Sequence, residues 1–272
     1  AELLAIKAEV EASEIAPFED NTVIEPLLDP SLKLKGSKVK ATATNDSLGY
    51  TEWTLKNGIK VVVRPSTLKA DEVIIYATAK GGKSMLSDAD YFHGDYLAMV
   101  MQQSGISKFS ATELAKQLSG KSAHASVGVG AYEHAVNASG SPKDIETILQ
   151  LMYLNFTAPR FDETDLQNLK NMYVPYFRNM ESDPNYLMGK AFQETLYQNH
   201  VRRQATSAAQ IESLNLETLA SLHKQLFSYA DDFRFVIAGN VDLNTLKPLV
   251  EKYIGSLPTS KSVDYAVVDD GV

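Results

Sequence analysis

The sequence predicts an α+β fold, in which an antiparallel β-sheet carries helices packed on one face. Two observations support this prediction. Strand-like segments occur in pairs joined by short turns, and helical segments are grouped between those pairs instead of alternating with single strands. Strands joined by hairpins favour an antiparallel sheet, whereas parallel neighbours need a crossover connection, usually a helix.

The first pair of strands lies in residues 51–66, TEWTLKNGIKVVVRPS. Asn57-Gly58 separates two β-rich runs and supplies the positive φ angles that a tight hairpin turn needs. A third strand, EVIIYATAKGG, ends at Gly81-Gly82. A second hairpin is expected in residues 121–140, around Gly128 to Ala131, and a last strand in residues 232–240.

Helices are expected where apolar residues recur every three or four positions. Ser110 is a predicted N-cap, with Glu113 three residues later to complete a capping box. Ser141 and Asp162 are predicted caps of later helices, and Pro175 predicts a kink or a stop. The expected helices cover residues 88–103, 110–120, 141–159, 160–180, 183–200, 215–227 and 242–258.

Residues 1–48 show a different pattern. Ala1 to Ile15 has the periodicity of a short helix, and the prolines and glycine that follow indicate a linker or extended strap. We therefore expect a boundary near residue 48, with a single α+β domain over residues 49–272. Both ends of the sequence are expected to be cuts in a longer polypeptide.

Composition narrows the classes of function. The net charge of -8 and the pI of about 5.2 disfavour nucleic acid as a partner. The chain has no cysteine, which excludes disulfides, thiolate metal sites and cysteine nucleophiles. No apolar run reaches the roughly 18 residues that a membrane-spanning helix needs.

Two motifs are incomplete. KGGKSMLSD ends a strand with Gly82-Lys83-Ser84, but the first glycine of a phosphate-binding loop would fall at Ala77, so a strand exit with two permissive glycines is the preferred interpretation. Serines are plentiful, but none lies in Gly-x-Ser-x-Gly, the pattern that would place a nucleophile at a sharp turn. Neither motif predicts catalysis.

Metal binding is the third alternative. Zinc peptidases need His-Glu-x-x-His or His-x-x-Glu-His, which place two imidazoles and a carboxylate on one helical face. From His93 the second pattern would need glutamate at 96 and histidine at 97, where the chain has Tyr96 and Leu97. His124 and His134 lie on the two arms of the second hairpin, where they could approach each other. His93, His124 and His134 stay weak candidates, and hydrogen-bonded or surface histidines are the preferred interpretation.

Several segments, taken in order, resemble the pitrilysin/insulinase family of zinc metallopeptidases. They are EWTLKNGIKVVVRPS, ATAKGGKS, SGSPKDIETILQLMYLNFTAPRF and FRFVIAGNVDLNTLKPLVEKYIGSLP. The resemblance covers residues 50–258 and is strongest to long bacterial members. It implies homologous α+β domains, usually four in a chain, that form two halves closing around a peptide.

In that family the zinc motif lies on the first long helix after the Gly-Gly strand exit. Here the three motif positions would fall near Tyr96, Met99 and Val100, none of which binds zinc or acts as a base. The distant glutamate would fall near Glu181. The resemblance therefore implies a non-catalytic domain of the second half, with residues 1–48 as the connection between the halves.

The expectations that follow are specific. This chain should have no catalytic residue, no metal and no cofactor of its own, whereas the longer protein would be a zinc-dependent endopeptidase. The expected partners are other domains of the same polypeptide and a peptide substrate, with substrate-contacting residues here left unassigned. The alternative is a catalytically inactive core subunit or interaction scaffold of the same fold. By resemblance, the location would be the periplasm or cell envelope of a bacterium.

Overall fold

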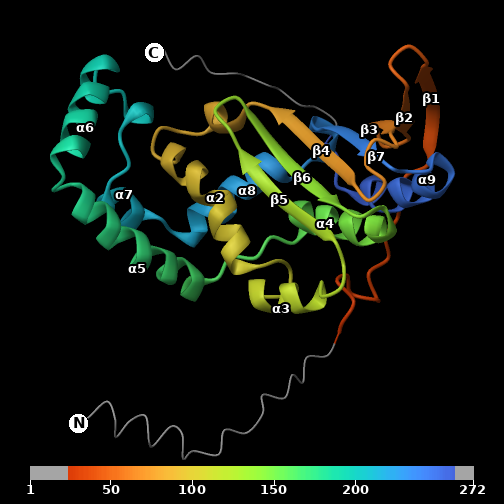
Figure 1. The fold of residues 1–272 in the computed structure, drawn as a ribbon, viewed down its shortest axis with the longest axis horizontal. Coiled ribbons are helices and arrows are strands. Elements are labelled where there is room, and N and C mark those ends of the chain that lie inside the picture. Colours follow the sequence, from red (N-terminus) through yellow and green to blue (C-terminus); the bar gives the residue numbers. More distant parts are fainter. Residues whose placement is uncertain (1–23, 261–272) are drawn as a thin grey trace, which may run out of the picture.

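A seven-stranded sheet organises residues 24–260, which are the residues described by the computed structural model (Figure 1). The strand order is β1-β2-β3-β7-β4-β6-β5. The strands are β1 (Val39–Asn45), β2 (Tyr50–Leu55), β3 (Lys60–Pro65), β4 (Val73–Lys80), β5 (Ala123–Val129), β6 (Glu133–Gly140) and β7 (Arg234–Gly239). The helix predicted for residues 1–15 lies outside the described residues.

The sheet is mixed rather than purely antiparallel. Five of the six strand pairings are antiparallel, as predicted, but β3 and β7 run parallel. β7 follows a long run of helices and enters between β3 and β4, so its direction is not set by a hairpin. The predicted packing of helices on one face is confirmed, because side chains along β4 alternate: Ile75 and Ala77 are buried, whereas Tyr76 is exposed.

Both predicted hairpins form. β2 and β3 pair in antiparallel register around Asn57-Gly58, and Gly58 has a φ of 99°. β5 and β6 pair over their whole length, from Ala123 opposite Gly140 to Val129 opposite His134. The turn residues and the β-rich flanks act locally, which explains why the sequence pattern was sufficient to predict these elements.

The helices lie close to the predicted ranges. Ser110 and Glu113 make the predicted capping box, and Asp162 caps its helix through its side chain. Pro175 lies inside a helix that continues to Met180, so it is no stop. Ser141 makes no side-chain cap, because a short 3₁₀ turn, η2 (Pro142–Asp144), precedes the helix. The helices are α2 (Tyr91–Ser104), α3 (Ala111–Gln117), α4 (Ile145–Thr157), α5 (Glu163–Met180), α6 (Pro184–Leu196), α7 (Ala208–Ser213), α8 (Leu216–Phe227) and α9 (Leu243–Lys252).

Part of the predicted strap belongs to the sheet. Residues 39–45 form the edge strand β1, which pairs with β2. Its side chains are exposed or half-buried along the whole strand, so the alternating apolar pattern that reveals a strand is missing. Glu251 anchors the start of β1: its carboxylate accepts hydrogen bonds from the Val39 backbone N–H (2.9 Å) and the Lys38 Nζ (2.7 Å).

The segment before β1 is tied to the helical layer. Leu27 is buried in a small second apolar cluster with Ile106, Phe109, Leu151 and Leu154. This contact fixes the path of the chain over the ends of α2 and α4, far from β1 in the sheet.

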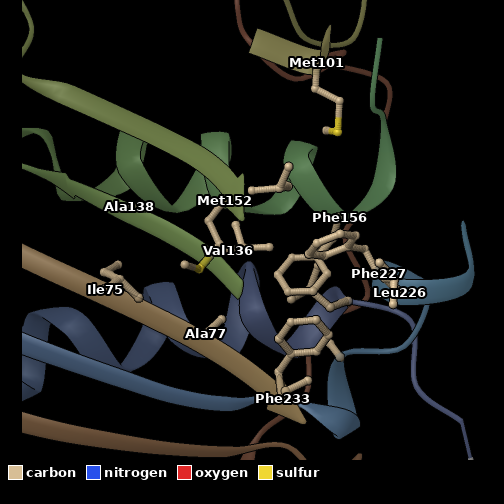
Figure 2. Packing of buried hydrophobic residues seen from close by; sticks show 14 of the residues in the cluster. Ile75, Ala77, Met101, Val136, Ala138, Met152, Phe156, Leu226, Phe227 and Phe233 are labelled. Carbon is tan, nitrogen blue, oxygen red and sulfur yellow. The ribbon is translucent and has the colours of Figure 1, made fainter. Parts of the chain in front are cut away.

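The main core lies between the sheet and the helices, and aromatic rings fill its centre (Figure 2). Phe156 of α4 meets Phe233 edge to face, with ring centroids 4.9 Å apart, and Phe227 of α8 stacks near Phe233 at 6.0 Å. Offset and edge-to-face ring pairs stabilise beyond the area they bury. These rings join α4 and α8 to the end of the sheet.

Two histidines belong to this aromatic cluster. His134 of β6 packs edge-on against Phe227 and Phe233, at 5.4 and 5.1 Å, and its Nδ1 accepts a hydrogen bond from the Gly82 N–H (3.3 Å). His223 of α8 stacks on Phe227, and its Nε2 donates to the Asn155 carbonyl (2.8 Å). Burial lowers the pKa of His134 to about 4 and also lowers the pKa of His223, because a charged ring would lose its water.

Phe156→Ala should remove about 3–5 kcal/mol from the free energy of unfolding, because it leaves a cavity between α4, α8 and the sheet. Tyr76→Ala on the exposed face of β4 is the matched control and should change stability by less than about 0.5 kcal/mol. Urea denaturation followed by circular dichroism measures both. Equal losses for the two variants would contradict the position of the core.

Stability should fall as the pH is lowered from 6.5 toward 4. The contribution of neutral His134 is fully present above the ordinary histidine pKa of 6.5. It is lost as the pH falls toward the folded-state pKa of about 4, because the unfolded chain takes up a proton in this range that the folded chain does not bind. The difference between 6.5 and about 4 corresponds to roughly 3 kcal/mol. Urea denaturation at pH 7 and at pH 4.5 measures the decrease in the free energy of unfolding. This decrease should be smaller in His134→Gln than in the unmodified chain. The exposed control His124→Gln should behave like the unmodified chain. An unchanged fall in His134→Gln would contradict this assignment.

Candidate functional site: the helix after the Gly-Gly strand exit

Gly81 and Gly82 connect β4 to α2 through a short 3₁₀ turn, η1 (Gly82–Met85). Both have positive φ, and a Cβ on Gly82 would lie 2.4 Å from the Gly130 carbonyl oxygen, so only glycine fits there. The amides of this turn hold the β5–β6 hairpin: the Lys83 N–H donates to Gly130 and the Ser84 N–H to Ala131, both at 2.9 Å. A phosphate-binding loop would need those N–H groups free, which supports the structural interpretation of Gly82-Lys83-Ser84.

Tyr96, Met99 and Val100, at the three expected positions of the zinc motif on α2, are packing residues. Val100 is buried in the main core, with 1% of its side chain exposed. Tyr96 is half-buried and lies against Phe92, with ring centroids 4.9 Å apart, and Met99 packs at the edge of the core. An imidazole at position 100 would face apolar side chains from the sheet. The helix therefore serves as a packing element.

His93 lies one turn before these positions and is buried, with 7% exposed. Its Nε2 is 3.4 Å from the amide nitrogen of Asn215, the residue that caps α8. Burial is the main cause that lowers the pKa of His93. These contacts place His93 at the junction of α2 and α8, as part of the packing between the two helices.

The structure separates His124 from His134. The strand register pairs His124 with Ser139 and His134 with Val129, so five residue steps lie between the two histidines. At about 3.3 Å per step this is roughly 17 Å along the strands. His134 points into the core, and His124 is exposed on the opposite face of the sheet. The expected approach of the two histidines is therefore wrong, because the strand register places them far apart and on opposite faces of the sheet.

Glu181 acts as a helix cap. Its carboxylate oxygen accepts a hydrogen bond from the Ala208 N–H (2.9 Å) at the start of α7, which ties the end of α5 to that helix. Within residues 24–260, no group of three or more histidine, aspartate and glutamate side chains is arranged to hold a metal ion. The donor set for zinc is missing in this part of the chain, so no catalytic step is derived through a metal.

A feature that sequence reasoning missed is a cavity of about 320 Å³ between β5 and α3. Its walls come from α2, α3, α4 and β5. No motif marks it, because the elements that enclose it lie far apart in the sequence.

The other unusual surface is α6. Met188, Phe192 and Leu196 recur every four residues along it, with 70%, 69% and 57% of their side chains exposed. The opposite side of α6 is held firmly: the Tyr186 hydroxyl donates to the Thr206 carbonyl (2.5 Å), and the Gln193 amide donates to the Arg203 carbonyl (2.6 Å). These three exposed residues are named here the α6 stripe, and α6 itself lies away from the sheet (Figure 1).

Comparison with known proteins finds similarity to peptidases. A family model described as "Peptidase M16 inactive domain" matches residues 213–271. A "Zinc protease PQQL-like" protein of Arabidopsis thaliana is 23% identical over 91% of this chain and 23% of its own length. "Probable zinc protease PqqL" of Escherichia coli K12 is 22% identical over 96% of this chain and 28% of its own length. The chain thus spans about a quarter of these relatives.

Solved structures share the fold. The ferredoxin protease FusC, in complex with Arabidopsis ferredoxin, superposes with a TM-score of 0.75 at 17% identity, over 97% of this chain and 29% of that one. The periplasmic protease PqqL from Escherichia coli gives 0.74 at 22% identity, over 96% and 28%. Pitrilysin gives 0.60 at 16% identity, over 84% and 25%. Residues 213–271 therefore match the family model described as the inactive domain of peptidase M16, and the chain as a whole shares the fold of these peptidase structures.

Proposed function

We propose that this chain is a non-catalytic wall domain of a larger zinc-dependent endopeptidase. The observation that carries the proposal is the state of α2, where Tyr96, Met99 and Val100 pack into or against the core at the positions of the zinc motif. The relatives named as zinc proteases are about four times as long as this chain, which leaves room for a catalytic domain elsewhere. Zinc would then belong to that domain.

The α6 stripe supports a docking role for this domain. Met188, Phe192 and Leu196 would expose apolar area on one side of a helix that is fixed on its other side. Contiguous exposed apolar residues mark protein interaction sites. The proposed occupant is another domain of the same polypeptide, which would close the wall around a peptide substrate.

Arg202 follows α6 in the chain and ties this helical segment to the residues between β4 and α2. Its guanidinium pairs with Asp88 (2.6 Å), donates to the Leu86 carbonyl (3.0 Å) and lies 5.0 Å from the Tyr91 ring centroid. Bidentate and stacked guanidinium contacts orient a segment in a fixed geometry. Because α6 is held in this way, it can set the angle at which a neighbouring domain docks.

The alternative is an inactive scaffold of the same fold, in which the whole protein has lost catalysis. The two differ in the rest of the gene: His-x-x-Glu-His upstream in the longer polypeptide supports the peptidase, and its absence supports the scaffold. A periplasmic or envelope location is part of the proposal, supported by the periplasmic PqqL neighbour. Within the described residues, no helix has the length and apolar character to cross a membrane.

The purified 272-residue chain should not hydrolyse peptides in a chelator-sensitive way, because the positions of the zinc motif hold no ligand. A quenched fluorogenic peptide, assayed with added zinc and with EDTA, measures this, and an X-ray fluorescence scan measures bound zinc. Hydrolysis that EDTA abolishes, together with stoichiometric zinc, would contradict the proposal.

Phe192→Gln should leave the stability of this chain within about 0.5 kcal/mol, because the ring is exposed. In the longer polypeptide the same change should lower the melting temperature, because it removes an apolar contact between domains. Thr195→Gln, on the same helix, is the control. It should lower neither the stability of this chain nor the melting temperature of the longer polypeptide. If Phe192→Gln destabilised the isolated chain as much as the longer polypeptide, the ring would stabilise this domain and not a contact between domains.

A further inference from the structure

β1 ends the sheet on the side opposite β5, and one of its backbone edges is unpaired. The strand order places β1 next to β2 alone, and Figure 1 shows β1 at the outer border of the molecule. Every second residue of a strand directs its N–H and C=O groups to the same side. Within residues 24–260, the groups of β1 that point away from β2 therefore have no partner strand.

Water reaches both faces of this strand as well. All residues from Lys40 to Thr44 are exposed, although Thr42 lies opposite the buried Trp53 of β2. The layer that covers the sheet thus ends at β2. A strand that is covered on neither face gains little stabilisation from burial. A second strand along the open edge would satisfy the free backbone groups of β1.

The usual protection of an edge strand covers only the start of β1. Lysine side chains and β-bulges discourage pairing with another chain. Here Lys40 and the bulge between Val39 and Ala41 both lie at the first residues of the strand. The residues that follow, ATATN, run in regular register with β2 and contain no charge, proline or glycine. Residues 41–45 thus form an edge of small and β-branched side chains that admits a second backbone.

The same residues complement a second copy of themselves. In a two-fold antiparallel pair centred on Ala43, this alanine lies opposite its own copy and Thr42 lies opposite Thr44. Cross-strand threonine pairs stabilise a sheet. Lys40 then lies opposite Asp46 at each end, so the charges along the edge meet with opposite sign. Both of these side chains are exposed, and neither forms an ion pair with another described residue.

We propose that β1 pairs with β1 of a second copy of this chain, which joins the two seven-stranded sheets into one continuous sheet. The two-fold axis lies perpendicular to the sheet, so the helices of both copies stay on the same face. A pairing along one short strand buries less area than stable dimers use, so the association is weak and depends on concentration. This pairing goes beyond the wall-domain role and does not rest on it.

Multi-angle light scattering of the full 272-residue chain measures the association. Physiological salt screens the net charge of -8 on each copy. We expect the average mass to rise from 29.9 kDa toward twice that value as the concentration reaches the high micromolar range. Ala43→Lys should stay monomeric, because two lysines would lie directly opposite each other. Ala43→Glu should also stay monomeric, and an equal mixture of the two variants should restore the dimer.

Disulfide cross-linking tests the register, because the chain has no cysteine of its own. The Cβ atoms of directly opposite residues lie about 4.5–5.5 Å apart, close to the separation that a disulfide needs. Ala43→Cys should therefore form a covalent dimer under mild oxidation. Ala41→Cys is the matched control, an exposed alanine on the same face of the same strand. Its copy lies roughly 13 Å further along the pair, so it should not cross-link.

Three outcomes would overturn the proposed pairing. The unmodified chain stays monomeric at every concentration; Ala43→Lys dimerises as strongly as the unmodified chain, which places the interface elsewhere; or Ala43→Cys cross-links no faster than Ala41→Cys. Circular dichroism checks that the variants, all at exposed positions, remain folded. None of these measurements involves the α6 stripe or peptide hydrolysis, so the pairing and the wall-domain role can fail independently.

Discussion

The insertion of β7 between β3 and β4 is the constraint on which the rest of the structure depends. Without β7, the sheet would consist of two separate units, β1-β2-β3 and β4-β6-β5, because no other strand joins them. Phe235 and Ile237 of β7 are fully buried and lie under the helical layer. β7 follows α2 to α8 in the chain, so the sheet is completed by pairing residues 234–239 with the distant residues 60–65 and 73–78.

Packing alone holds α2 in place. One side of the helix packs on the sheet through Leu97 and Val100, and its start is fixed by the Gly81-Gly82 exit and by His93 against Asn215. Each contact is apolar or neutral and contributes to stability. A buried charged ligand would instead carry a cost unless a metal or a partner compensated for it.

Two surfaces remain without a partner in the described part of the chain, and they differ in kind. The α6 stripe is convex, apolar and held rigidly by hydrogen bonds on its other side, which suits docking against a large neighbour. The cavity between β5 and α3 is concave and lined mainly by apolar side chains.

The sequence by itself determined the local elements. Asn57-Gly58 produced a hairpin, Ser110 and Glu113 a capping box, and the periodic apolar residues their helices, because turn, cap and face depend on neighbours a few residues away. Once the resemblance had assigned the motif positions, the sequence also showed that Tyr96, Met99 and Val100 are not zinc ligands. Only the tertiary structure decided the parallel place of β7, the entry of residues 39–45 into the sheet, and the separation of His124 from His134. These depend on strand order and register, which are set by side chains far apart in the sequence packing into one core.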